Sequence, residues 1–124
     1  MARILIAEDE EPLRTLIKRA LAEEGHLVVA TADGSDALDV LQSEAGRFDL
    51  LLTDIKMPMM DGIALALAVA RDFPKLPILL MTGYADQRER VSGLEALICD
   101  VISKPFALAE IKFAVASALA KGKR

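Results

Sequence analysis

Short apolar runs alternate along the chain with longer amphipathic stretches. Five runs have the length of a β-strand, and they cover residues 4–7, 27–30, 49–53, 77–81 and 97–102. The first, third and fourth are apolar almost throughout, which is typical of strands buried on both faces of a parallel sheet. The pattern therefore predicts five strands, three of them enclosed by the rest of the protein.

Helical periodicity fills the intervals between these runs. Apolar residues recur at helical spacing after the first run, at Leu13, Leu16, Ile17, Ala20 and Leu21. Further helices are predicted over residues 35–45 and 63–72, from residue 86 onward, and along the stripe Leu108, Ile111, Val115 and Leu119. Five strand–helix units with short connections predict one α/β domain over residues 1–124, with a parallel sheet covered on both faces.

Composition narrows the class of protein. The chain has 124 residues, which fit one domain, and 53% of them are hydrophobic, enough for a buried core. A formal charge of −4 argues against a protein that coats nucleic acid. The longest apolar run, residues 63–70, is too short to cross a bilayer, the N-terminus lacks a signal-peptide cleavage site, and the single cysteine excludes an internal disulfide. We expect a cytoplasmic protein.

Carboxylates gather at one edge of the predicted sheet, where the strands end and where open parallel sheets bind their ligands. Glu8 and Asp9 follow the first run, Asp54 follows the third, and Thr82 and Lys104 follow the last two. Two carboxylates about 4 Å apart repel by about 4 kcal/mol at an effective dielectric of about 20, so the cluster predicts a bound cation. An all-oxygen ligand set favours Mg²⁺, and Lys104 supplies a charge that can pair with a phosphoryl oxygen.

Four motifs resemble the receiver domain of two-component response regulators, the family of the chemotaxis response regulator. They are Ile-Ala-Glu-Asp-Glu at 6–10, Leu-Leu-Thr-Asp-Ile-Lys-Met-Pro-Met-Met-Asp-Gly at 51–62, Met-Thr-Gly at 81–83 and Ser-Lys-Pro-Phe at 103–106. Each motif is weak by itself, but all four in this order are highly specific. The resemblance implies a flavodoxin-like (CheY-like) doubly wound sheet of five parallel strands, in the order 2-1-3-4-5, flanked by five helices.

The resemblance also implies a role for each carboxylate. Asp54 would be the phosphoacceptor, a carboxylate nucleophile that attacks the phosphohistidine of a sensor histidine kinase or phosphotransfer protein. Mg²⁺ would bind Asp9 and Asp54 directly, Glu8 through water, and the main-chain carbonyl of Lys56. Glu8 departs from the family's usual aspartate by one methylene, which we expect to shift the metal geometry slightly.

Two further residues would contact the phosphoryl group once it is bound. The resemblance implies that Thr82 moves its hydroxyl onto this group and that Lys104 forms a salt bridge to it, with a cis peptide bond between Lys104 and Pro105. The phosphoryl group would then leave by slow self-catalysed hydrolysis. We therefore do not expect an enzyme in the ordinary sense.

A switch aromatic usually lies three residues before the lysine in this family, and here that position is Val101. We predict that Tyr84 takes its place and reorients when Thr82 moves; the alternative is a solvated loop tyrosine. Phe113 lies off the buried stripe of the last helix. It is either an interface residue, on the output face formed by the last two helices and the last strand, or packed under a neighbour.

The sequence argues against two other classes of protein and leaves a third open. A phosphatase of the haloacid-dehalogenase type needs a second aspartate two residues after the nucleophile, where this chain has Lys56. A flavodoxin-like electron carrier needs a loop rich in Ser, Thr and Gly after the first strand, where this chain has four acids. An atypical receiver that acts only as an interaction adaptor, or one that serves as a phosphate relay, stays open.

Only five residues follow Leu119, so we expect a stand-alone regulator that signals through a protein target, with homodimerisation possible and without DNA binding or membrane insertion. Two stretches, Met-Thr-Gly-Tyr and Val-Ile-Ser-Lys-Pro-Phe, resemble alphaproteobacterial single-domain regulators of the CpdR type. In those regulators the unphosphorylated form primes a protease for substrate delivery, which would make this chain a protease adaptor.

Overall fold

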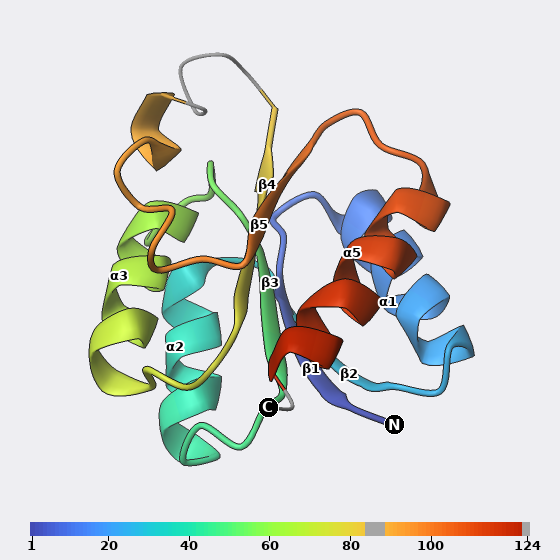
Figure 1. Ribbon diagram of the computed structural model, residues 1–124, viewed down its shortest axis with the longest axis horizontal. Coiled ribbons are helices and arrows are strands. Elements are labelled where there is room, and N and C mark those ends of the chain that lie inside the picture. Colours follow the sequence, from blue (N-terminus) through green and yellow to red (C-terminus); the bar gives the residue numbers. More distant parts are fainter. Residues whose placement is uncertain (84–88, 123–124) are drawn as a thin grey trace.

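A parallel sheet of five strands forms the centre of the molecule (Figure 1). The computed structural model describes residues 1–83 and 89–122. Its elements are β1 (Arg3–Ala7), α1 (Glu11–Glu23), β2 (Leu27–Thr31), α2 (Gly34–Ser43), β3 (Leu50–Asp54), α3 (Gly62–Asp72), β4 (Ile78–Thr82), β5 (Asp100–Ser103) and α5 (Leu108–Gly122). The strand order is β2-β1-β3-β4-β5 and every pairing is parallel, which confirms the predicted fold.

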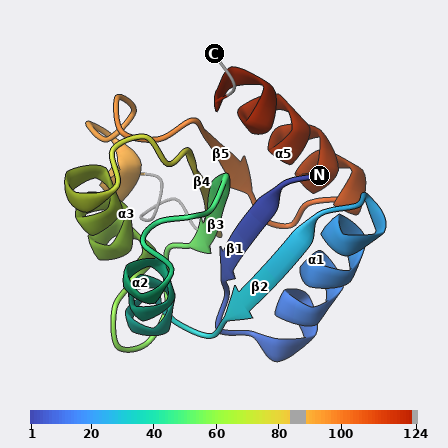
Figure 2. The same ribbon diagram turned by 90° about the horizontal axis from the view of Figure 1, so that it is seen from below.

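Helices cover both faces of the sheet, α2 and α3 on one side and α1 and α5 on the other (Figure 2). Successive strand residues point to opposite faces, so each strand contributes to two separate cores. Leu5 and Leu51 pack in the core under α2 and α3, whereas Ile6 and Leu52 pack in the core under α1 and α5. β3 and β4 are buried at every position, as their apolar sequences predict.

The structure corrects two details of the predicted elements. β5 begins at Asp100 and not at Leu97, because the chain is still in a turn closed by the Leu97 amide on the Leu94 carbonyl. Leu16 is 46% exposed, so the buried stripe of α1 is narrower than its apolar sequence suggests. Of the helix predicted from residue 86, residues 89–91 are described and are helical.

Two Asp-Gly pairs shape the chain on either side of β3. Asp33 and Asp61 cap α2 and α3, each accepting a hydrogen bond from the amide three residues later. Gly34 and Gly62 follow them, where the backbone is so close to its neighbours that a Cβ would overlap the Met60 carbonyl oxygen in one case and the Asp54 carbonyl oxygen in the other. The loop after β3 therefore depends on two residues without side chains.

We predict that Gly62→Ala lowers the free energy of unfolding by at least about 3 kcal/mol, because the added methyl group meets backbone that cannot move aside. Gly25→Ala is the matched control: Gly25 has a φ of +91° but open space around its Cβ position. That change should cost only about 1 to 2 kcal/mol, the penalty of the left-handed conformation. Urea denaturation checks both values, and equal losses in the two variants would contradict the overlap at Gly62.

Candidate functional site

The carboxyl ends of the strands meet at one edge of the sheet, and main-chain hydrogen bonds between neighbouring strands continue just beyond them. These bonds run from Glu8 N to Thr31 O at 3.0 Å, from Ile55 N to Met81 O at 3.2 Å, and from Lys104 N to Thr82 O at 2.7 Å. The residues that carry the predicted site therefore stand on backbone that the sheet itself holds in place.

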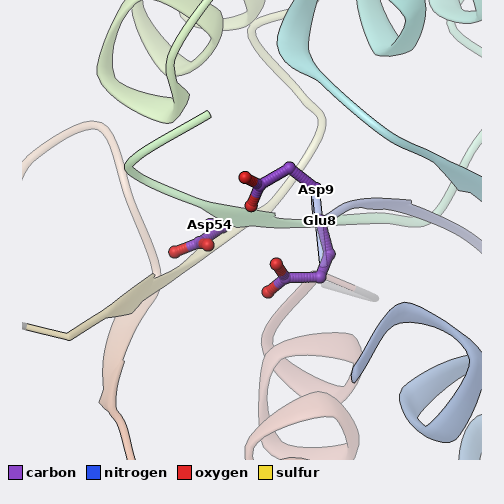
Figure 3. Close-up of side chains that lie close together, drawn as sticks. All are labelled: Glu8, Asp9 and Asp54. Atoms are coloured by element: carbon purple, nitrogen blue, oxygen red, sulfur yellow. The ribbon is translucent and has the colours of Figure 1, made fainter. Parts of the chain in front are cut away.

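Three carboxylates converge at this edge, those of Glu8, Asp9 and Asp54 (Figure 3). Each offers one oxygen, and these oxygens all lie within 4.8 Å of one another. Glu8 and Asp54 are buried, and Asp9 is exposed. Such an all-oxygen group, open on one side, could hold a divalent cation, as the sequence predicted.

Lys104 joins two of these carboxylates. Its Nζ donates to Glu8 Oε1 and to Asp54 Oδ2, each at 3.0 Å. The other oxygen of each carboxylate also accepts a hydrogen bond, from the Glu10 amide at 3.0 Å and from the Ile55 amide at 2.9 Å. One ammonium thus faces two buried carboxylates, so the site keeps an excess of negative charge even before Asp9 is counted.

This arrangement shifts the protonation of both partners. Burial raises the pKa of Glu8 from its usual 4.5 to about 7, and the charge of Asp54 acts in the same direction, against the Glu10 amide and Lys104. Burial alone would lower the pKa of Lys104, but its hydrogen bonds to Glu8 and Asp54 raise it above the usual value. The lysine therefore stays charged, and without a cation Glu8 can take up a proton near neutral pH.

A cavity of about 580 Å³ opens beside the carboxylates, within the range of about 300 to 1,000 Å³ that accepts small ligands. Its walls are Asp9, Glu10, Leu13, Asp54, Lys56, Gly83, Lys104, Pro105 and Phe106. The peptide bond between Lys104 and Pro105 is cis, as predicted. An incoming group therefore meets the nucleophile candidate Asp54 and the ammonium of Lys104 in one space.

Thr82, the last residue of β4, carries a buried hydroxyl. In the part of the chain that the structure describes, this hydroxyl is the buried side-chain oxygen that lacks a hydrogen-bond partner. A buried hydroxyl without a partner is unfavourable, and such a group points to a role outside the resting fold. A hydroxyl that gains its partner only when a phosphoryl group arrives fits this observation.

Two of the residues predicted to form a switch or interface, Val101 and Phe113, are not part of the cavity walls. Val101 is half-buried in β5 against the core under α2 and α3, and Phe113 of α5 is 77% exposed. Both line a groove of about 540 Å³ between β5 and α5. The position of Phe113 off the buried stripe is confirmed, while its role stays a prediction. Tyr84 lies outside the described residues.

Sequence reasoning missed Arg14, which supports the loop that carries the first two acids. Its Nη1 donates to the main-chain carbonyl of Glu8 at 3.0 Å and lies 3.5 Å from that of Asp9. The sequence did contain a signal for this contact. Arg14 is a basic residue in the first turns of a helix, where a negative charge is favoured. Arg14 thus fixes the backbone next to the acidic group.

A second missed contact joins Asp61, the capping residue of α3, to Arg90. The guanidinium lies 2.6 Å from Asp61 Oδ2. Partial burial would raise the pKa of Asp61, but the Ala64 amide and Arg90 lower it below the usual value. The loop after β3 is therefore tied to the helical residues 89–91.

Comparisons with known proteins agree with this geometry. The family model of the response regulator receiver domain matches residues 4–116. Response regulator MprA of Mycobacterium avium is 38% identical over 109 residues, which are 88% of this chain and 47% of that protein. Response regulator MprA of Mycobacterium tuberculosis H37Rv is also 38% identical, over 46% of its length. The chain therefore spans about half the length of these relatives.

Solved structures with the same fold include two receiver domains. The signal receiver domain of a signal transduction histidine kinase from Syntrophus aciditrophicus is 32% identical, with a TM-score of 0.88 over 100% of this chain and 94% of that one. A CheY-like receiver domain protein from Methanospirillum hungatei JF-1 is 28% identical, with a TM-score of 0.89 over 99% and 97%. In the described part of the chain, no helix has the length and apolar character needed to span a bilayer.

The raised pKa of Glu8 predicts how stability changes with pH in the absence of divalent cations. A carboxyl whose pKa is raised by folding favours the folded state while it is protonated; this contribution is present below pH 4.5 and is lost as the pH rises through about 7. Over that interval the wild-type protein should lose up to about 3 kcal/mol more free energy of unfolding than Glu8→Gln. Denaturation at several pH values with EDTA checks this, with Glu11→Gln as an exposed control. Parallel wild-type and Glu8→Gln curves would be the contrary result.

The unpartnered hydroxyl of Thr82 predicts an unusual response to substitution. Thr82→Val keeps the shape and removes the unsatisfied oxygen, so the unphosphorylated protein should be unchanged or up to about 1 kcal/mol more stable. Thr53→Val is the matched control in the neighbouring strand, because the Thr53 hydroxyl donates to the Asp54 carbonyl at 2.9 Å. This control should cost about 1 kcal/mol. Thermal unfolding measures both, and a larger loss at Thr82 would show that its hydroxyl has a partner at rest.

Proposed function

The chain belongs to the family of response regulator receiver domains, which act in two-component signalling, and within that family we propose that it accepts a phosphoryl group on Asp54. The observation that carries this proposal is the position of Asp54, whose carboxylate lies on the cavity wall with Lys104 Nζ 3.0 Å from Oδ2. The donor would be the phosphohistidine of a sensor histidine kinase or of a phosphotransfer protein.

The transfer exchanges one bond for another. A carboxylate oxygen of Asp54 forms a bond to phosphorus while the phosphorus–nitrogen bond to the donor imidazole breaks. The electron pair of that bond returns to the imidazole nitrogen, which takes a proton from solvent. The product is an acyl phosphate on Asp54, with more negative charge at the edge of the sheet than before.

Compensation of this charge requires cations on the cavity side. Asp9, Asp54 and the main-chain carbonyl of Lys56 would hold Mg²⁺, since the carboxylate oxygens lie within 4.8 Å of one another and Lys56 lines the same cavity. A bound Mg²⁺ supplies charge neutralisation and orientation of the phosphoryl oxygens. Lys104 is positioned to move its hydrogen bond from Asp54 Oδ2 to a phosphoryl oxygen, and Thr82 would supply the hydroxyl.

The output would be a change in protein binding. The groove between β5 and α5, with Phe113 77% exposed beside it, supports a protein target, and the net charge of −4 does not suit DNA. We propose a stand-alone regulator that works by self-catalysed phosphotransfer and slow hydrolysis of the acyl phosphate. A homodimer would use the same exposed surface.

We predict that a small phosphodonor such as acetyl phosphate, given with Mg²⁺, adds the mass of one phosphoryl group to the wild-type protein. The carboxylate of Asp54 is the acceptor, so Asp54→Asn should abolish the mass gain, and EDTA should abolish it in the wild type. Intact-protein mass spectrometry measures the gain. Asp39→Asn, an exposed change on α2, is the control and should behave like the wild type. A gain that persists in Asp54→Asn would place the acceptor elsewhere and end the proposal.

A further inference from the structure

The edge of the sheet opposite β5 is open. β2 is the outermost strand there and pairs with β1 on one side only (Figure 2). On the paired side, the Leu27 amide and the Thr31 carbonyl form hydrogen bonds of 2.9 and 3.0 Å to residues that flank β1. Because the peptide groups of a strand alternate in direction, the amides and carbonyls of Val28 and Ala30 point to the open side. Both residues therefore turn a donor and an acceptor outward.

β2 lacks the features that usually shield an edge strand. Natural edges carry lysine, proline, a bulge or a covering segment, which discourage pairing with another chain. Residues 27–32 read Leu-Val-Val-Ala-Thr-Ala, without charge or proline, and β2 pairs with β1 in one register over all five residues. Among the residues that the structure describes, none bonds to the outward groups of Val28 and Ala30. The edge can thus accept a further strand.

Two apolar side chains of β2 are exposed on the face that α2 covers. Leu27 is 54% and Val29 is 37% exposed. Val29 is in register with Leu5, which packs in the core under α2 and α3, so Leu27 and Val29 lie on that face of the sheet. Val28 and Ala30 point the other way and pack against the core under α1 and α5. A strand added at this edge would cover Leu27 and Val29 with its own side chains.

The charge around β2 indicates which kind of strand fits. Residues 11–44, which include α1, β2 and α2, carry seven acidic and three basic side chains, and their net −4 equals the net charge of the whole chain. Glu23 and Glu24 precede the strand, Asp36 and Asp39 follow it, and all four are exposed. A basic partner is attracted to this edge, whereas a second copy of the chain would bring the same negative charge to it.

We propose that the open edge of β2 docks an extended segment of a partner protein, with alternating apolar residues between two basic ends. The segment adds a sixth strand to the sheet. Its main chain bonds to the outward groups of Val28 and Ala30, its apolar side chains cover Leu27 and Val29, and its basic ends face the acids on either side of β2.

This docking site is separate from the surfaces that phosphorylation would use. β1 lies between β2 and β3, which carries Asp54, and the groove between β5 and α5 is at the opposite edge of the sheet. A segment bound to β2 therefore leaves both accessible. We expect its affinity to be the same with and without a phosphoryl group on Asp54.

A synthetic peptide tests the proposal. The sequence Lys-Lys-Val-Thr-Val-Thr-Val-Lys-Lys, acetylated and amidated at its ends, has the proposed chemistry, and the same peptide with glutamate for lysine is its control. We expect fluorescence anisotropy to give the basic peptide a Kd at least about tenfold below that of the acidic one. Raising the NaCl concentration to about 0.5 M should reduce this difference, because salt screens exposed charges.

Hydrogen exchange followed by NMR reports where the peptide binds. The amides of Val28 and Ala30 should exchange at least about tenfold more slowly when the peptide is bound, because they gain hydrogen-bond acceptors. The amides of Leu27 and Val29 already face β1, so their exchange should change less.

Variants separate this edge from the rest of the surface. Val29→Lys places a charge on the edge strand and should raise the Kd of the basic peptide at least about tenfold, with Leu27→Lys as the second variant if Val29→Lys folds poorly. Phe113→Lys makes the same change of charge at the exposed side chain of α5 and should leave the Kd within about twofold of the wild-type value. Asp54→Asn should bind the peptide like the wild type, so failure of this proposal is distinguishable from failure of the proposed function.

Each of three results would overturn the proposal. A basic peptide that does not bind, or that binds without slowing exchange at Val28 and Ala30, would show that β2 does not dock a strand. Equal Kd values for the two peptides would exclude a basic partner. Slow exchange at the same two amides without peptide, together with a dimer in analytical ultracentrifugation, would make a second copy of the chain the occupant.

Discussion

The ion pairs of the Lys104 ammonium bring together three strand ends that are far apart in the sequence. Its partners Glu8 and Asp54 lie 96 and 50 residues away along the chain. The two buried carboxylates have oxygens within 4.8 Å of each other and would repel one another. The ammonium between them therefore stabilises this edge of the sheet, in addition to its part in the chemistry. The sheet in turn sets the distances, because its main-chain hydrogen bonds fix each strand end to its neighbour.

The apolar sequences of β3 and β4 made their burial predictable, because a continuous apolar run can be satisfied only between two layers of helices. Once the strands were placed, the site followed, since parallel strands end at one edge. The start of β5 was predicted too early, because the apolar residues Leu97 and Ile98 precede the strand, with Leu97 at the end of a turn. Local pattern does not distinguish a strand from the turn that leads into it.

The sequence could not predict which side chains of the site contact one another, and the reason is different. Glu8 and Asp9 are neighbours of the same charge, yet one is buried against Lys104 and the other faces the cavity. The direction of each side chain depends on the path of the loop after β1 and on the contact of Arg14 with that loop, which are three-dimensional properties. The same holds for the hydroxyl of Thr82, whose lack of a partner is visible only when all its neighbours are in place.

The carboxylate of Asp61 serves two structures at once: Oδ1 caps α3 and Oδ2 pairs with Arg90. Exposed ion pairs alone contribute little, about 0 to 1 kcal/mol, but a lost cap adds to that cost. A substitution of this one residue would therefore weaken the start of α3 and the attachment of residues 89–91 together. Substitution of Arg90 would remove only the exposed ion pair, whereas substitution of Asp61 would remove both the ion pair and the cap.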